Sequence, residues 1–284
     1  MHHTGASRHG AVLIAVAGVA ALGWIYLTMT VLAVPDGPRG ALGPGMNLLA
    51  FGAPVPAFME ALCVPVTLAT GLDPQALAVT LAMWIAMVFA MMLPSAAPMI
   101  QAYSSALRDL EPSKRKAQRL VALSAGYVSV WTGFAVVACA AQIALVFVGT
   151  LSPAMTPLAP ALAGMTLLAA GLYQFTPAKQ ACLGRCRAPV SQAAVRWQIR
   201  ARSAYRVGLE EGLYCLGCCW ALMVVMFAVG IMNVVWMAVL AILMVAEKVT
   251  SGMVLPRAVG TGLVVWGALL VLISQPGRLL LGIG

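Results

Sequence analysis

Long apolar runs, separated by short polar or basic segments, dominate this sequence. The runs are continuous rather than alternating with a period of two, and several approach the roughly 20 residues that a helix needs to cross a bilayer. Backbone groups inside lipid must pair within their own segment, which favours helices. The pattern therefore predicts an all-α, polytopic transmembrane helical bundle of about seven spans. The expected spans are 11–34, 78–106, 119–149, 157–175, 208–229, 231–249 and 257–274.

Two features interrupt these runs. Gly230 and Asn233 fall within an apolar stretch that is too long for one crossing, which predicts a tight hairpin between the fifth and sixth spans. Pro94 and Pro98 lie inside the second span. Each removes a backbone donor, so this helix should kink and leave carbonyl groups free.

Composition and charge support a membrane location. The chain of 284 residues is 62% hydrophobic and 9% charged, whereas a soluble domain carries about a quarter charged residues. With the N-terminus in the cytoplasm, only Arg39 and Arg278 of the 17 lysines and arginines fall outside, and the remaining 15 fall inside. The net charge of +9 therefore indicates topology and contact with an anionic lipid bilayer. No motif points to nucleic acid as a partner.

Cysteines supply the strongest chemical signal. Five of the seven fall within 38 residues, namely Cys182, Cys186, Cys215, Cys218 and Cys219. At about 100° per residue, the last three share roughly 100° of one helix face. Thiolates favour Cu(I), zinc or iron–sulfur clusters, although free cysteines also pack as small apolar residues. A cytosolic location argues against a structural disulfide, so a metal or redox site is the better interpretation.

Methionines supply a weaker signal. Met83, Met87 and Met91 follow an i, i+4 row in the second span, and Met226 lies on the cysteine face about 16 Å deeper, at ~1.5 Å per residue. Thioethers bind Cu(I), but a methionine row at helical spacing is also ordinary core packing. We include these four as candidate ligands.

Other motifs are absent. The sequence has no HExxH, P-loop, GxSxG or dinucleotide fingerprint, and no CxxCH for haem, so it favours a non-enzymatic role. Glu247 and Lys248 close the sixth span, and we expect them to pair with each other.

Several stretches carry a family resemblance: "MWIAMVFAMMLPSAAPM", "YQFTPAKQACLGRCRAP", "GLYCLGCCWALM", "GIMNVVWM" and "AEKV". Together they resemble a bacterial family of predicted metal-binding integral membrane proteins, a domain-of-unknown-function family with some members labelled copper chaperones. The similarity covers about 78–262. It implies a multi-pass protein of the bacterial inner membrane with a metal site. The residues carried over are Trp84, Met87, Met91, Met92, Pro94, Pro98, Tyr103, Tyr173, Gln174, Lys179, Cys182, Cys186, Cys215, Cys218, Cys219, Asn233, Glu247 and Lys248.

The chain then divides into three parts. These are the N-terminal tail and first transmembrane helix (1–34), an outer Pro/Gly-rich loop (35–77), and a metal-binding transmembrane helical domain (78–284) with an inner cysteine-containing loop (176–207).

The resulting hypothesis is membrane-embedded handling of a soft transition metal. Cu(I) fits best, ahead of zinc or an iron–sulfur cluster. The ion would move by ligand exchange through the cysteines and the intramembrane methionines, in chaperoning, delivery or transport, with a metal-donor or metal-acceptor protein or a membrane complex as partner. Two alternatives stay open. One is a membrane thiol–disulfide oxidoreductase that pairs Cys215 with Cys218 and Cys182 with Cys186. The other is a structural or accessory subunit of a larger complex.

Overall fold

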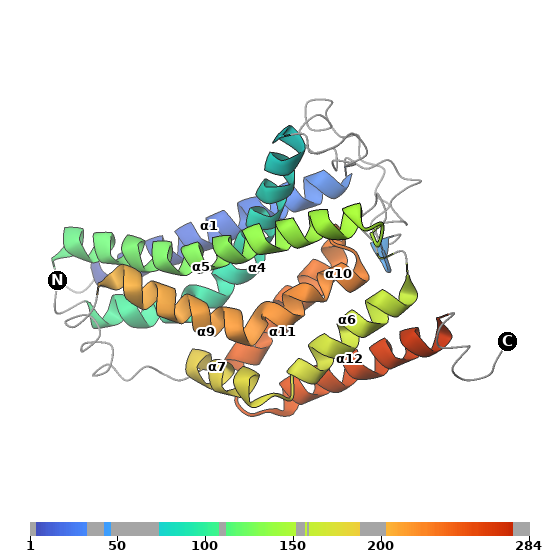
Figure 1. Cartoon of the computed structure of the whole chain (residues 1–284). Coiled ribbons are helices and arrows are strands. Elements are labelled where there is room, and N and C mark those ends of the chain that lie inside the picture. The colour runs from blue at the N-terminus through green and yellow to red at the C-terminus, as the bar shows by residue number, and fades with distance from the viewer. Residues whose placement is uncertain are drawn as a thin grey trace.

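The described part of the chain is built from α-helices (Figure 1). A computed structural model describes residues 4–32, 43–46, 74–107, 112–151, 157, 159–187 and 203–274. The helices are α1 (Thr4–Leu32), α4 (Pro74–Ala106), α5 (Ser113–Phe147), α6 (Pro160–Tyr173), α7 (Pro177–Arg187), α9 (Ala204–Val224), α10 (Met226–Val229), α11 (Val234–Val249) and α12 (Val254–Ile273). No β-strand occurs among these residues, which confirms the all-α prediction. Most of the predicted outer loop 35–77 lies outside the described residues.

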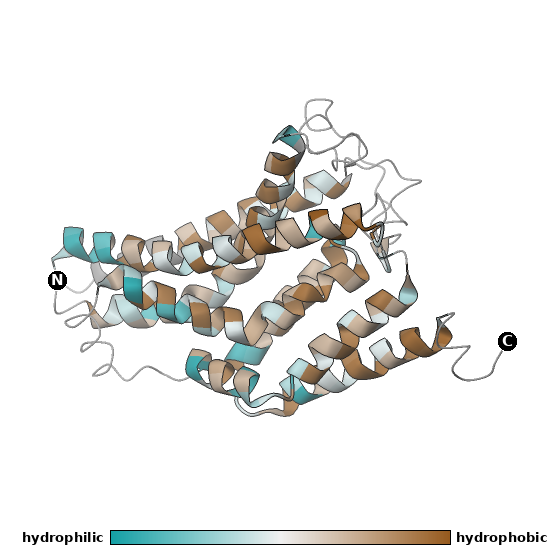
Figure 2. Ribbon diagram, viewed as in Figure 1, coloured by the Kyte–Doolittle hydropathy of each residue, from teal (hydrophilic) through white to brown (hydrophobic). Residues whose placement is uncertain are grey.

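Within the described residues, five segments are long and apolar enough to cross a membrane: Ile14–Val31, Leu77–Ala106, Lys114–Phe147, Ala204–Val229 and Val254–Ile273. Helices α6 and α11 occupy two further predicted spans, but they contain only 14 and 16 residues. The seven-span count and the cytoplasmic N-terminus therefore stay predictions. Large apolar side chains such as Ile14, Val121 and Ile242 are exposed on the outside of the bundle, which suits contact with lipid. Figure 2 shows hydrophilic residues at the N-terminal end of α5, in the first half of α9 and on α7.

The hairpin predicted between the fifth and sixth spans is confirmed. Gly230 ends α10 with φ +106°, a conformation that glycine adopts without steric cost. Asn233 then begins α11, and its side chain accepts a hydrogen bond from the Trp236 backbone N–H at 3.1 Å. The Asn233 amide also donates to the Pro44 and Val229 carbonyls, at 3.0 and 3.3 Å. The turn is thus held to both the preceding helix and the 43–46 segment.

Helix α4 continues through both prolines but changes direction along its length (Figure 1). Pro94 has no N–H to donate to the carbonyl of Ala90, four residues earlier. The indole Nε1 of Trp24 in α1 donates to that carbonyl instead, at 3.1 Å. The carbonyl freed by the proline therefore attaches α4 to its neighbour α1.

Helices α5 and α9 pack at very close range through glycine. A Cβ added at Gly208 would lie 2.0 Å from the Leu123 carbonyl oxygen, and one added at Gly126 would lie 2.1 Å from the Tyr205 carbonyl oxygen. The obstructing atoms are backbone, which cannot move aside as a flexible side chain would. This seam fixes the position of α9 in the bundle.

We expect Gly208→Ala to lower the free energy of unfolding by about 1–3 kcal/mol or more, because α5 and α9 must separate to admit the methyl group. Thermal unfolding in detergent measures the effect. Gly133→Ala is the matched control on α5, since a Cβ there meets nothing within 4 Å. The control should leave stability unchanged or raise it slightly through helix propensity. Equal melting temperatures for Gly208→Ala and the wild type would contradict this packing.

Candidate metal centre

Helix α9 carries a compact cluster of three buried thiols, which we call the thiol cluster. Cys215, Cys218 and Cys219 are 2%, 1% and 1% exposed, and their sulfur atoms all lie within 4.8 Å of one another. The spacing of three and four residues places them on one helix face, as the sequence predicts. At its first turn the helix is capped by the Ser203 hydroxyl, which accepts from the Arg206 backbone N–H.

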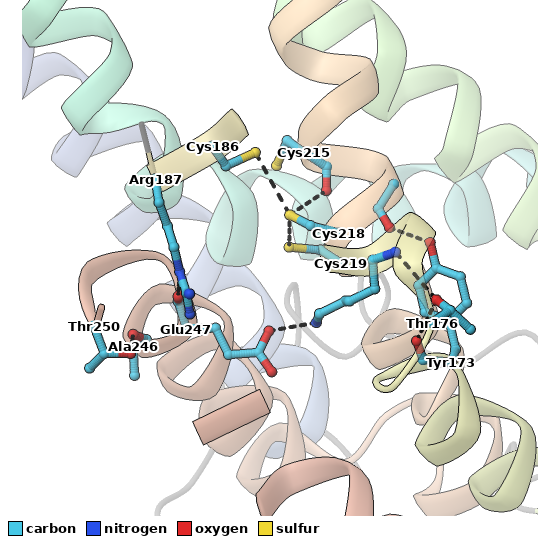
Figure 3. Close-up of polar contacts among 12 residues, drawn as sticks. Tyr173, Thr176, Cys186, Arg187, Cys215, Cys218, Cys219, Ala246, Glu247 and Thr250 are labelled. Atoms are coloured by element: carbon cyan, nitrogen blue, oxygen red, sulfur yellow. Dashed lines mark hydrogen bonds and ion pairs between the residues drawn. The ribbon is translucent and has the colours of Figure 1, made fainter. Parts of the chain in front are cut away.

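Cys218 has sulfur neighbours on both α9 and α7. Its Sγ lies 3.3 Å from the Sγ of Cys219 and 3.8 Å from the Sγ of Cys186, which points toward it from α7 (Figure 3). Its thiol also donates to the Cys215 carbonyl at 3.1 Å. A tetrahedral site with metal–sulfur bonds of about 2.3 Å places its sulfurs roughly 3.8 Å apart. The observed separations therefore suit sulfurs that surround a single ion.

Helix α7 covers the thiol cluster and adds the other two cysteines. Cys182 and Cys186 are both partly buried. The Cys182 sulfur lies only 2.6 Å from where a Cβ of Gly217 would stand, so the absence of a side chain at 217 lets α7 approach α9. Residues 177–187, which the sequence pattern predicts as part of an inner loop, are therefore a helix that brings its cysteines to the cluster.

Polar contacts attach α7 to the end of α11 (Figure 3). The Lys179 ammonium lies 2.6 Å from the Glu247 carboxylate, and the two side chains are 0% and 1% exposed. Arg187 donates through Nε to the Glu247 backbone carbonyl and through Nη1 to the Gly252 carbonyl, both at 2.6 Å. Lys179 and Arg187 thus fix the position of the helix that carries Cys182 and Cys186.

A ring of hydrogen bonds surrounds Cys215 on the other side of the cluster. Lys248 donates to the Cys215 sulfur at 3.0 Å and to the Ser95 hydroxyl at 2.8 Å. The Tyr127 hydroxyl lies 3.0 Å from the same sulfur and donates to the Met92 carbonyl at 3.2 Å. Ser95 also donates to the Met92 carbonyl, at 2.8 Å, which closes the ring. Four helices, α4, α5, α9 and α11, therefore meet at one cysteine.

The expected pairing of Glu247 with Lys248 is wrong. Glu247 pairs with Lys179, and Lys248 binds Cys215 and Ser95. Consecutive helical residues point about 100° apart, so the two side chains face different neighbours. Charged residues at the end of an apolar span marked Glu247 and Lys248 as candidates for an ion pair, but not with which partners. Ser95 and Tyr127 gave no such signal and were not predicted.

The four candidate methionines lie in the buried core. Met83 is 7% exposed, and Met87, Met91 and Met226 are fully buried. They belong to the same apolar core as the aromatic pair of Trp84 and Phe227, whose ring centroids are 5.5 Å apart. Burial suits packing and metal binding equally, so a ligand role for these methionines stays a prediction.

Helices apolar enough to span a membrane, together with a buried three-thiol cluster, are features of a membrane protein with a candidate metal-binding site. The chain belongs to the PpoB2 family, described as copper chaperone, whose sequence pattern matches residues 81–270, about two thirds of the chain. This match confirms the resemblance seen in the motifs and supports copper as the metal. Neither a curated protein nor a solved structure matches the chain.

Proposed function

We propose that this protein is a copper chaperone embedded in the bacterial inner membrane, which binds one Cu(I) at the thiol cluster and passes it on by ligand exchange. The observation that carries this proposal is the set of three buried sulfurs within 4.8 Å of one another, with the Cys186 sulfur 3.8 Å from one of them. Sulfur-only donor sets select soft ions, and Cu(I) is softer than zinc. The space between these sulfurs suits a single ion better than an iron–sulfur cluster.

The binding step involves proton release and no electron transfer. Each thiol that ligates the ion loses its proton, and copper stays Cu(I) throughout. The three thiols of α9 are buried, so a donor or acceptor protein must reach them through a more accessible ligand. Cys186 and Cys182 are partly buried and belong to α7, which packs against α9. We assign them as the ligands through which the ion arrives and leaves, at the predicted cytosolic face.

The deeper methionines would extend the same chemistry. Met226, Met83, Met87 and Met91 offer thioether sulfur in the core, where a bare cation is costly and a soft ligand is the alternative to water. In this proposal they form weaker, transient sites beyond the thiol cluster.

Anaerobic purification in detergent followed by Cu(I) titration against a chromogenic chelator tests the function. We expect close to one tightly held Cu(I) per chain and weaker binding of zinc. A wild-type protein that holds no Cu(I) against the chelator would overturn the proposal. A reversible disulfide in that metal-free protein would favour the oxidoreductase alternative, whether it forms in the expected pairs Cys215–Cys218 and Cys182–Cys186 or between Cys186 and Cys218, whose sulfurs are 3.8 Å apart. Co-purification of a metal-free chain with a larger complex would favour an accessory subunit.

A further inference from the structure

Copper bound at the thiol cluster would leave net negative charge in a buried site, because the cysteines carry more charge than the ion. Three thiolates and one Cu(I) leave two net negative charges in a buried site. Uncompensated buried charge is costly, so a cation close to the sulfurs would stabilise the loaded state.

The basic residues on α7 have other partners. Lys179 pairs with Glu247, and Arg187 donates to two backbone carbonyls. Arg185 lies 4.0 Å from the Glu211 carboxylate, with its guanidinium over the Tyr214 ring. Lys248, at the end of α11, is the described lysine whose ammonium donates directly to a sulfur of the cluster.

We propose that Lys248 is a positioning residue of the copper site. Its positive charge compensates the thiolate–copper unit, and its hydrogen bond holds Cys215 as the anchoring ligand. Ser95 and Tyr127 support this arrangement, because each bonds to one end of the Lys248–Cys215 contact and both bond to the Met92 carbonyl. The inference rests on the proposed function and adds to it a residue that is not itself a ligand.

This arrangement distinguishes the two sides of the cluster. Cys215 is restrained by Lys248 and Tyr127, from α11 and α5. Cys218 faces Cys186, which is on α7 and is partly buried. The ion would therefore stay bound to Cys215 longest, while the sulfurs of Cys218 and Cys186 exchange first with a partner.

Cu(I) competition titrations of Lys248→Gln and Lys248→Arg in the full chain test this role. Lys248→Gln removes the charge while keeping a hydrogen-bond donor. We expect it to weaken Cu(I) binding roughly 10- to 100-fold, which is the usual effect of losing an outer-shell partner. Lys248→Arg keeps the charge and should restore most of the affinity. The near-ultraviolet thiolate-to-copper charge-transfer band should shift in Lys248→Gln and stay close to the wild-type position in Lys248→Arg.

Arg257→Gln is the control, because it removes the same charge from an exposed position near the start of α12. It should bind Cu(I) as the wild type does. Wild-type affinity and an unshifted band in Lys248→Gln would overturn the inference, as would an equal loss in Arg257→Gln.

If Lys248→Gln fails to fold, Ser95→Ala replaces it. Ser95→Ala frees the ammonium from one partner and should weaken binding by a smaller factor, and an unchanged affinity would contradict the role. The wild-type titration reports on the proposed function, and the ratio of variant to wild type reports on Lys248.

Discussion

Replacing Cys218 with serine should abolish tight copper binding. Its sulfur lies 3.3 Å from the Cys219 sulfur on α9 and 3.8 Å from the Cys186 sulfur on α7. Its loss therefore removes one ligand and also the sulfur that connects the ligands of α9 with that of α7. Loss of an outer-shell partner alone costs 10- to 100-fold in affinity, so we expect about 100-fold or more for this ligand. Competition with a Cu(I) chelator, together with copper content after anaerobic purification, measures it.

Cys139→Ala is the matched control for this prediction. Cys139 is also a buried thiol in a long helix, 6% exposed, but it is on α5 and is not part of the thiol cluster. Its replacement should leave copper stoichiometry and affinity unchanged. If Cys218→Ser keeps wild-type affinity, the thiol cluster is not the copper site. If Cys139→Ala loses copper as well, the effect comes from general damage to the fold.

Features that are local in sequence could be predicted well. The shared face of Cys215, Cys218 and Cys219 depends only on helical spacing. The hairpin at Gly230 and Asn233 follows from turn chemistry within a stretch too long for one crossing. The loss of the helix hydrogen bond to the Ala90 carbonyl follows from the missing N–H of Pro94. Each of these rests on residues a few positions apart.

Features that depend on helix packing could not be predicted. Lys248 and Ser95 are 153 residues apart, and Tyr127 and Cys215 are 88 apart. These contacts depend on how α4, α5, α9 and α11 pack. If one of these helices were rotated about its axis by one residue, about 100°, each of these side chains would face a different partner. The neighbours Glu247 and Lys248 show the limit, because the rotation of α11 sends one toward Lys179 and the other toward Cys215. The cysteine spacing assigns a helix face to the thiols but cannot supply the donors around it.

The buried ion pair of Lys179 and Glu247 gives the largest expected effect on stability. One carboxylate oxygen of Glu247 accepts a hydrogen bond from the Lys179 ammonium at 2.6 Å, and the side chains of Lys179 and Glu247 are 0% and 1% exposed. The single variants Lys179→Met and Glu247→Leu each leave an uncompensated charge inside the bundle. We expect each to lower the free energy of unfolding by roughly 3–5 kcal/mol, measured by denaturant or thermal unfolding in detergent.

The double variant Lys179→Met/Glu247→Leu removes both charges and should recover most or all of that loss, since apolar residues of similar volume often replace a buried pair without cost. Two single variants within about 1 kcal/mol of wild type would contradict the pair's burial, because an exposed ion pair contributes at most that much.

Measuring Cu(I) affinity in the double variant distinguishes the contribution of this ion pair to stability from its contribution to the position of α7. Arg187 donates to two backbone carbonyls, which these side-chain substitutions leave in place. If those bonds alone keep Cys186 beside Cys218, the double variant will bind Cu(I) as tightly as the wild type. If the ion pair also sets the register of α7 on α11, the double variant will be stable yet bind Cu(I) more weakly. We expect the second result, because Lys179, Cys182 and Cys186 are spaced i, i+3 and i+7 and therefore share one face of α7. The ion pair with α11 then helps to set how this face, with Cys186 beside Cys218, meets α9.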